Sequence, residues 1–556
     1  MDRLKHIKDR VDFLYASRSQ EVFDKLTLLF DRYETIAEKP WVSEHDAILI
    51  TYGDTLSKTG EAPLVTLKRF LDDHTDGEIN DIHILPFCPY TSDDGFAVID
   101  YKQINPSLGS WGDVRSLAAD YDLMFDAVVN HISSKSPWFL EYLSGNPKYQ
   151  NYFIEADPTL DYSMVTRPRA LPLLTEVETP QGTKHVWTTF SADQIDLNFQ
   201  DPDLLIEMMD VLLMYATNGA RFIRLDAIGF AWKQLGTSCM HLKETHELVK
   251  LMRDVVEVIA PGTILITETN VPHLDNIAYF GNGHDEAQMV YQFPLPPLTL
   301  YSFLTGDASK LSQWADSLDE TTSDTSYFNF LASHDGIGMR PTEGILSDAE
   351  KQIMVDHTLN NGGRVNFKFN ADGSKSPYEL NINFMDALTP LSEHDDLRAK
   401  KMLAAQVILL SVIGVPGIYI HSLLGSRNDY KGLEASGINR RINREKLSYD
   451  QLVAELEAGL RHTIFSSYKA LLKIRKSQSA FNPRAKQVVE FIDDRLFAIK
   501  RVNEDTDEEI FVLVNVSQER VEVSERYKGI DIVANQTVDG AFTMSPYQYM
   551  WVKKSS

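Results

Sequence analysis

"FIRLDAIGF", residues 222–230, reads as an apolar strand that ends in two opposite charges. Side chains two positions apart in an extended segment point to the same face, so Arg224 and Asp226 are expected to stand side by side. Taken alone, such a pair is most simply a structural ion pair. Its meaning depends on how many other strands of the chain end in the same way.

Short apolar runs, many of them closed by polar residues, recur along the chain. Amphipathic stretches such as "THELVKLMRDVVEVIA" (245–260) lie between most of them, a pattern typical of parallel strands with crossover helices. Eight such units predict an α/β fold, a (β/α)₈ TIM barrel. The runs are "DAILITYGD" (46–54), "DIHILPF" (81–87), "DLMFDAVVNH" (122–131), "ARFIRLDA" (220–227), "TILITETN" (263–270), "AQMVYQF" (287–293), "YFNFLASHD" (327–335) and "VPGIYI" (415–420).

The stretches after the third and seventh strands are much longer than one crossover helix needs, which predicts an inserted domain at each place. Loops this long in a compact protein are usually functional. After residue 480 short strands follow one another without helices, which predicts a C-terminal all-β domain. The predicted organisation is an N-terminal helical extension (1–45), barrel segments (46–131, 206–335 and 401–480), inserted domains (132–205 and 336–400) and a C-terminal β domain (481–556).

Composition narrows the class of protein. The chain has 556 residues, 43% of them hydrophobic, and no apolar run of membrane-spanning length. Its two cysteines, Cys88 and Cys239, are too few for a disulfide framework and lie in no metal-like cluster, so we expect a cytoplasmic protein. The sequence offers no convincing cluster of oxygen ligands and no glycine fingerprint after a strand, so we expect neither a metal nor a cofactor. A net charge of −26 argues against nucleic acid and anionic membranes as partners. The oligomeric state stays open, with a homodimer as one candidate.

Polar residues at the strand ends would meet at the carboxyl end of such a barrel, where barrel enzymes carry their chemistry. Carboxylates gathered there repel one another, which costs free energy unless function requires them. We expect Arg224 to keep Asp226 ionised beside a second carboxyl with a raised pKa, as a retaining glycosidic double displacement requires. The converging residues are Asp126, Asn130, His131, Arg224, Asp226, Glu268, His334 and Asp335.

Four of these stretches carry a family resemblance. "DAVVNH", "FIRLDA", "ITETN" and "LASHDG" resemble, in order and spacing, the four motif regions of the α-amylase superfamily, glycoside hydrolase family 13. The resemblance implies Asp226 as nucleophile, Glu268 as general acid/base and Asp335 as the third carboxylate. It further implies that His131 and His334 bind sugar hydroxyls and that Arg224 orients the nucleophile.

Further stretches resemble the sucrose phosphorylase subfamily: "HILPF", "SDDGFAVIDY", "RPRALP", "GTSC", "LPPL", "HDGIG" and "INR". This resemblance implies that Asp93 and Arg440 pair across a closed pocket for one glucosyl unit. Phosphate then replaces water in the second displacement, and in so acidic a protein it needs arginines. Arg167 and Arg169 are the predicted phosphate ligands, with Tyr378 as a possible partner.

The choice of donor rests on finer detail. The N-terminal extension, "NFLASHDGIG" and "SPYELN" resemble glucosylglycerate phosphorylases more than sucrose phosphorylases. Ala332 and Ser333 stand where the latter usually have Asp and Thr, and Glu379 stands where they usually have Gln; Glu379 suits an anionic acceptor only if it binds hydroxyls or pairs with an arginine. The predicted partners are phosphate, 2-O-α-D-glucosyl-D-glycerate and glucose 1-phosphate. Sucrose or sucrose 6-phosphate phosphorylase, an α-glucosidase and a non-catalytic relative remain as alternatives.

Overall fold

The computed structural model describes residues 3–169, 171–369 and 374–555. Its central feature is a closed barrel of eight strands in the order β1-β16-β12-β11-β10-β9-β4-β3. Each strand overlaps one of the eight runs, so the predicted barrel is confirmed. The strands are β1 (Ile48–Thr51), β3 (Asp81–Ile84), β4 (Asp122–Ala127), β9 (Ala220–Leu225), β10 (Ile264–Thr267), β11 (Met289–Tyr291), β12 (Ser326–Phe330) and β16 (Val415–Tyr419).

The chain divides into two compact units. The first comprises Met1–Trp41, His83–Thr269 and Leu274–Val290, and it contains the parallel ladder β4-β9-β10-β11. The second comprises Val42–Ile82, Asn270–His273 and Tyr291–Ser556, and it contains the parallel ladder β1-β16-β12.

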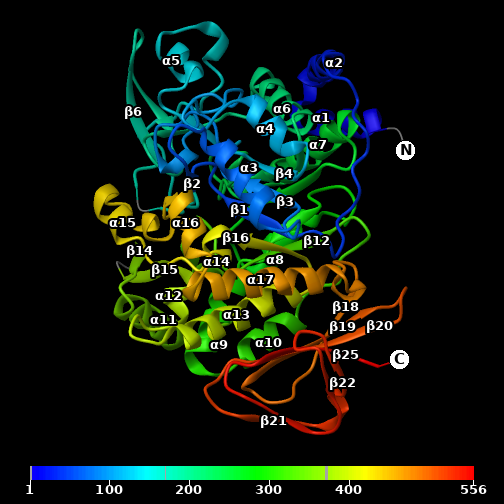
Figure 1. Ribbon diagram of the computed structural model, residues 1–556. Helices are drawn as coiled ribbons and strands as arrows, with labels where there is room; N and C mark the ends of the chain where they lie inside the picture. The colour runs from blue at the N-terminus through cyan, green and yellow to red at the C-terminus, as the bar shows by residue number, and fades with distance from the viewer. Residues whose placement is uncertain (1–2, 170, 370–373, 556) are drawn as a thin grey trace. The chain divides into compact units, whose positions relative to one another are not determined.

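In the first unit, two N-terminal helices pack on the barrel helices (Figure 1). Helix α1 (Arg3–Tyr15) contacts α7 (Lys243–Ile259), and α2 (Ser19–Phe30) contacts α6 (Pro202–Thr217). Helix α7 buries one face of its sequence, including Leu248, Met252 and Val256, as an amphipathic helix should. Helices α1 and α2 lie within residues 1–45, and the predicted N-terminal extension with these bounds stays a prediction.

Both places of predicted insertion hold antiparallel strands. After β4, strand β5 (His131–Ser133) pairs with β8 (Gln194–Asp196), and β6 (Leu174–Thr179) pairs with β7 (Gly182–Trp187). After β12, a three-stranded sheet has the order β13-β15-β14, from β13 (Ile337–Gly338), β15 (Lys375–Asn381) and β14 (Arg364–Phe369). Residues 170 and 370–373 of these insertions lie outside the described residues, and the domain boundaries stay predictions.

A separate β sheet ends the chain, as predicted (Figure 1). Its six strands have the order β18-β19-β20-β25-β22-β23: β18 (Lys486–Val489), β19 (Leu496–Asn503), β20 (Glu508–Asn515), β25 (Tyr549–Lys553), β22 (Gly529–Asp531) and β23 (Gln536–Val538). Beside it β21 (Val521–Val523) pairs with β24 (Phe542–Met544). Among the residues described here, no helix has the length and apolar content needed to cross a membrane.

Candidate active site

Neighbouring strand ends in the first unit hold three carboxylates at one edge. Asp126 on β4 lies opposite Arg224 on β9. Beyond the strands the ladder continues, because the Asp226 N–H donates to Ala127 O at 3.1 Å and the Glu268 N–H donates to Leu225 O at 3.1 Å. Backbone pairing therefore fixes the backbone positions of Asp126, Asp226 and Glu268 along this edge.

One guanidinium faces all three carboxylates. Arg224 is buried, its Nη1 pairs with Asp126 and lies 2.8 Å from Asp226 Oδ1, and its Nη2 lies 3.9 Å from Glu268 Oε2. The Ala227 N–H, on a residue with φ 49°, donates to Glu268 Oε2 at 3.0 Å. The predicted contact of Arg224 with Asp226 is present, and the same arginine also serves the neighbouring carboxylates.

The charge balance at Asp226 differs from the expectation. The pKa of Asp226 is raised to about 8, with burial as the largest cause; Arg224 lowers this pKa, and the charges of Glu268 and Asp126 add to the rise. The direction of this shift runs against the expectation that Arg224 keeps Asp226 ionised, because burial and two neighbouring carboxylates outweigh one guanidinium. Asp226 and Glu268 can instead share one proton, which is the number that an anionic nucleophile and a protonated acid require.

Sequence reasoning missed His83 on β3. Its Nε2 lies 2.6 Å from Asp126 Oδ2, and only 1% of its side chain is exposed. Its Nδ1 is buried without a hydrogen-bond partner among the described residues, so Nε2 is the ring nitrogen that donates to Asp126. A single histidine inside the apolar run "DIHILPF" was the only signal in the sequence.

Asn130 belongs to a buried polar cluster that includes a second missed residue, Lys233. The Lys233 Nζ donates to Asn130 Oδ1 at 2.7 Å and lies 2.7 Å from Asp196 Oδ2, and burial lowers the pKa of Lys233. The ammonium thus sits between the two oxygens. Within the described part of the chain, no group of three or more His, Cys, Asp or Glu side chains is arranged to hold a metal ion.

His131 is neutral in its setting. Burial lowers the pKa of His131 to about 4. Its Nε2 lies 2.9 Å from Phe96 O, its Nδ1 lies 3.2 Å from Asn130 Nδ2, and Gln194 Nε2 lies 3.2 Å from Nε2. The ring is thereby oriented by its protein neighbours.

Asp93 and the predicted phosphate arginines lie in the same unit. Arg169 Nη2 lies 3.2 Å from Asp93 Oδ2, and its guanidinium stands over the Phe190 ring at 5.5 Å. Asp93 has φ 55°, a strained conformation of a kind that clusters at functional sites. Arg167 is exposed and forms no ion pair with the residues that the structure describes. Arg169 is thus partly committed to Asp93, whereas Arg167 is available to an anion.

In the second unit, Arg440 joins two carboxylates. Its Nε and Nη2 donate to both oxygens of Glu379 at 3.2 and 2.9 Å, and its Nη1 lies 2.7 Å from Asp335 Oδ1. Glu379 Oε1 also accepts from the Gly336 N–H at 3.1 Å. Glu379 therefore does pair with an arginine, which is one of the two conditions under which it fits an anionic acceptor.

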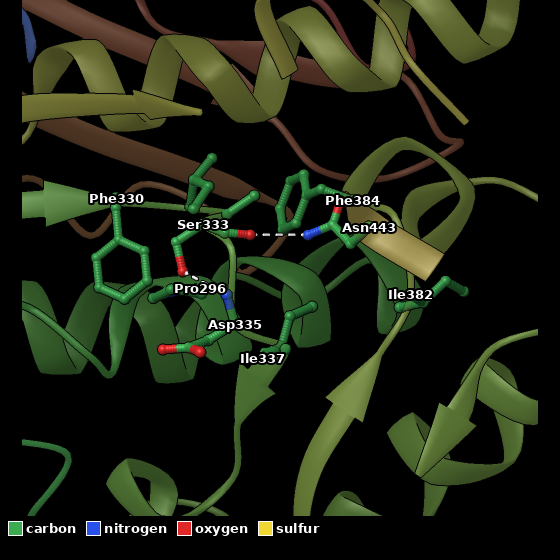
Figure 2. A pocket seen from close by; sticks show the side chains of 11 residues that line it. Pro296, Phe330, Ser333, Asp335, Ile337, Ile382, Phe384 and Asn443 are labelled. Atoms are coloured by element: carbon green, nitrogen blue, oxygen red, sulfur yellow. Dashed lines mark hydrogen bonds between the residues drawn. The ribbon is translucent and has the colours of Figure 1, made fainter. Parts of the chain in front are cut away.

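Hydrogen bonds from Asn443, in η7 (Asn439–Asn443), and from the residue after it hold the loop after β12 that carries Asp335. Figure 2 shows the bond between Asn443 and Ser333. The Asn443 side chain donates to Ser333 O at 2.9 Å, and Arg444 Nε donates to His334 O at 2.7 Å. His334 Nε2 lies 3.6 Å from Asp335 Oδ1. A cavity of about 10 Å³ lies beside this loop.

The predicted residues therefore form two groups, one in each unit. The first contains Asp93, Asp126, Asn130, His131, Arg167, Arg169, Arg224, Asp226 and Glu268; the second contains His334, Asp335, Glu379 and Arg440, with Tyr378 next to Glu379 on β15. The predicted pair of Asp93 with Arg440 involves one residue of each group and stays a prediction.

Comparisons with known proteins place the chain. Residues 76–344 match the family described as Alpha amylase, catalytic domain. Glucosylglycerate phosphorylases from Allomeiothermus silvanus and Escherichia coli (strain K12) are 47% and 46% identical to this chain, each over 98% of it and over 98% and 99% of their own lengths. A sucrose phosphorylase from Streptococcus mutans is 29% identical over 82% of this chain and 93% of its own.

Solved structures agree on the fold. A sucrose 6F-phosphate phosphorylase from Thermoanaerobacter thermosaccharolyticum matches with a TM-score of 0.74 at 23% identity, covering 86% of this chain and 94% of that one. An α-amylase from H.orenii matches with a TM-score of 0.67 at 16% identity, over 92% of this chain and 100% of that one. The chain belongs to the α-amylase superfamily and, within it, to the group that includes the glucosylglycerate phosphorylases.

Proposed function

We propose that this protein is a retaining glycoside phosphorylase that cleaves 2-O-α-D-glucosyl-D-glycerate with phosphate, reversibly, to α-D-glucose 1-phosphate and D-glycerate. The observation that carries the proposal is the identity of 46–47% to three glucosylglycerate phosphorylases over nearly the whole chain. Sucrose phosphorylases stand at 27–30%. Phosphate and glucose 1-phosphate are substrates in either case.

The reaction proceeds by two displacements. Asp226 attacks the anomeric carbon while Glu268 protonates the leaving glycerate oxygen, so that a β-glucosyl ester forms and the glycosidic bond breaks. A phosphate oxygen then attacks the same carbon, Glu268 takes the phosphate proton, and the ester bond to Asp226 breaks. Two inversions return the α configuration. The contacts of Arg224 with Asp226 and of the Ala227 N–H with Glu268 support these roles.

The remaining predicted residues bind the glucosyl unit and phosphate in this proposal. Asp335, His131, His334, Asp93 and Arg440 hold sugar hydroxyls and close the glucosyl subsite. The predicted ligands of phosphate are Arg167, Arg169 and Tyr378. The pairing of Glu379 with Arg440 supports a role in shaping the acceptor side, because it cancels the charge of Glu379 that would repel glycerate.

The acceptor is tested with purified protein and α-glucose 1-phosphate. Phosphate release is measured with D-glycerate, fructose, fructose 6-phosphate and glycerol at equal concentration. We expect D-glycerate to give the highest kcat/KM. A clear advantage for fructose or fructose 6-phosphate would instead make the protein a sucrose or sucrose 6-phosphate phosphorylase.

The reaction class is tested separately. Donor cleavage should depend on phosphate and give α-glucose 1-phosphate, whereas an α-glucosidase would release glucose at the same rate without phosphate. Asp226→Asn should lower turnover of every donor by about 10⁴-fold or more. We also propose that the protein is cytoplasmic. Its assembly state, for which a homodimer is one candidate, is tested by light scattering on the purified protein.

A further inference from the structure

Residues 237–241, "TSCMH", form a short segment of the first unit with an unusual backbone. Cys239 has φ 51° and His241 has φ 54°, a left-handed conformation that is costly for residues with a side chain. Such conformations persist only where the surroundings hold them. The 237–241 segment makes such contacts on two sides.

On one side, the segment grips the loop that carries Arg167 and Arg169. The Thr166 N–H donates to Ser238 O at 2.9 Å, immediately before Arg167. Cys239, which is 2% exposed, belongs to an apolar cluster with Val165, Leu173 and Trp187. Val165 precedes the two arginines and Leu173 follows them, so the cluster anchors both ends of the arginine loop.

On the other side, the segment is tied to the residues that follow the nucleophile. The His241 N–H donates to Gly229 O at 2.9 Å, and His241 Nδ1 lies 2.8 Å from the Tyr279 hydroxyl. A Cβ on Gly229 would stand 3.0 Å from His241 Cε1, so the ring lies directly against this backbone. Gly229 belongs to η4 (Ile228–Phe230), which begins two residues after Asp226.

A second route joins the same two loops through aromatic rings. Phe230 of η4 packs edge-on against Phe190 with ring centroids 5.5 Å apart. The Arg169 guanidinium stands over the same Phe190 ring. The arginine loop and η4 are thus connected twice, once through the Phe190 ring and once through the 237–241 segment.

We propose that the 237–241 segment is a positioning element, anchored by Cys239, which holds the Arg167 and Arg169 loop at a fixed distance from Asp226 so that phosphate meets the glucosyl ester in line. The inference rests on the proposed phosphorylase function. Its reason is geometric, because a displacement of about 1 Å in a reacting group can cost about 100-fold in rate. Formation of the ester needs no phosphate and should be much less sensitive.

The test compares single variants of the full chain in two assays, the KM for phosphate in phosphorolysis and the rate of glucose release from donor without phosphate. Cys239→Ala removes the anchor and should raise the phosphate KM about tenfold, with glucose release changed by less than about twofold. Cys239→Ser, which keeps the size of the side chain and can still donate to Gln234 O, should restore most of the affinity.

Cys88→Ala is the matched control. Cys88 is 3% exposed, and its hydrogen-bond neighbours, Tyr101 and Tyr215, are not part of the arginine loop. It should leave the phosphate KM unchanged. If Cys239→Ala does not fold, His241→Asn replaces it, because Asn tolerates the left-handed conformation while losing the contact with Tyr279; the same rise in phosphate KM is expected.

Arg167→Ala separates this inference from the function on which it rests. A raised phosphate KM in both Arg167→Ala and Cys239→Ala supports the positioning role. Suppose that Arg167→Ala raises the phosphate KM, but Cys239→Ala either leaves this KM unchanged or lowers the rates of phosphorolysis and of glucose release by the same factor. The positioning role is then overturned, and the phosphate site stands. If Arg167→Ala has no effect on the phosphate KM, the assigned phosphate site is wrong and the inference falls with it.

Discussion

At the scale of single residues, the proposed nucleophile Asp226 lowers the stability of the folded protein as pH rises. Burial raises its pKa to about 8 in the folded protein, well above the ordinary value of 3.8. Because folding raises this pKa, the folded protein holds the proton more tightly than the unfolded chain, and the associated stability is lost as pH rises from about 4 to about 8. Asp226→Asn should therefore raise the free energy of unfolding by about 1–3 kcal/mol at pH 8. Denaturant titrations at pH 4 and pH 8 check this, with no gain expected at pH 4; a gain of equal size at both pH values would contradict the charge argument.

Asp126 tunes the same group. Beyond burial, which dominates, the charges of Glu268 and Asp126 raise the pKa of Asp226 and that of Arg224 lowers it. Asp126→Asn removes one negative neighbour and leaves Arg224 Nη1 to Asp226. Because the proposed mechanism uses Asp226 as the anion, the acidic limb of the pH profile of kcat/KM should move to lower pH by roughly one unit. A shift to higher pH would show instead that the Asp126 charge is needed to keep Arg224 in place.

Single residues also show what the sequence could and could not predict. The contact of Arg224 with Asp226 follows from strand alternation, so two positions in one stretch were enough. The pairing of Glu379 with Arg440 joins β15 to η7, 61 positions apart, and no local pattern encodes it. His83 and Lys233 were missed for the same reason, since each finds its partners only after the strands have assembled.

At the scale of elements, apolar runs bounded by polar residues located all eight barrel strands, because buried parallel strands leave a strong local signal. For the inserted segments, only position and length could be predicted, since short antiparallel pairs such as β5 with β8 are defined by partners far away in sequence. Lys233 links the barrel to this inserted pair. It follows η4 after β9, and its ammonium reaches Asp196 on β8 and Asn130 just before β5.

Lys233 should therefore stabilise the attachment of the β5–β8 pair to the barrel strand β9. Lys233→Met leaves Asp196 buried with an uncompensated charge, and loss of one partner of a buried pair costs about 3–5 kcal/mol. Urea unfolding measures the loss. Lys25→Met is the control, because Lys25 makes exposed pairs with Glu21 and Asp203 that should contribute less than about 1 kcal/mol. Equal losses in the two variants would show that the Lys233 pair carries no special weight.

At the scale of the whole molecule, a net charge of −26 opposes the approach of phosphate and glycerate, both anions. As a proposed phosphate ligand, the exposed Arg167 would attract phosphate at short range. The repulsion from the distributed charge acts over the Debye length, which falls from about 30 Å to about 8 Å between about 0.01 M and about 0.15 M salt. Added salt should thus screen the repulsion more than the attraction.

We therefore expect kcat/KM for phosphate to rise roughly twofold or more over this range of ionic strength. Glucose release to water from the same donor serves as the control, because its acceptor is neutral and the donor is common to both assays; the ratio of the two rates isolates the effect on phosphate. A ratio that falls steadily from the lowest salt would mean that the arginine loop, not the overall charge, governs the long-range field that phosphate meets.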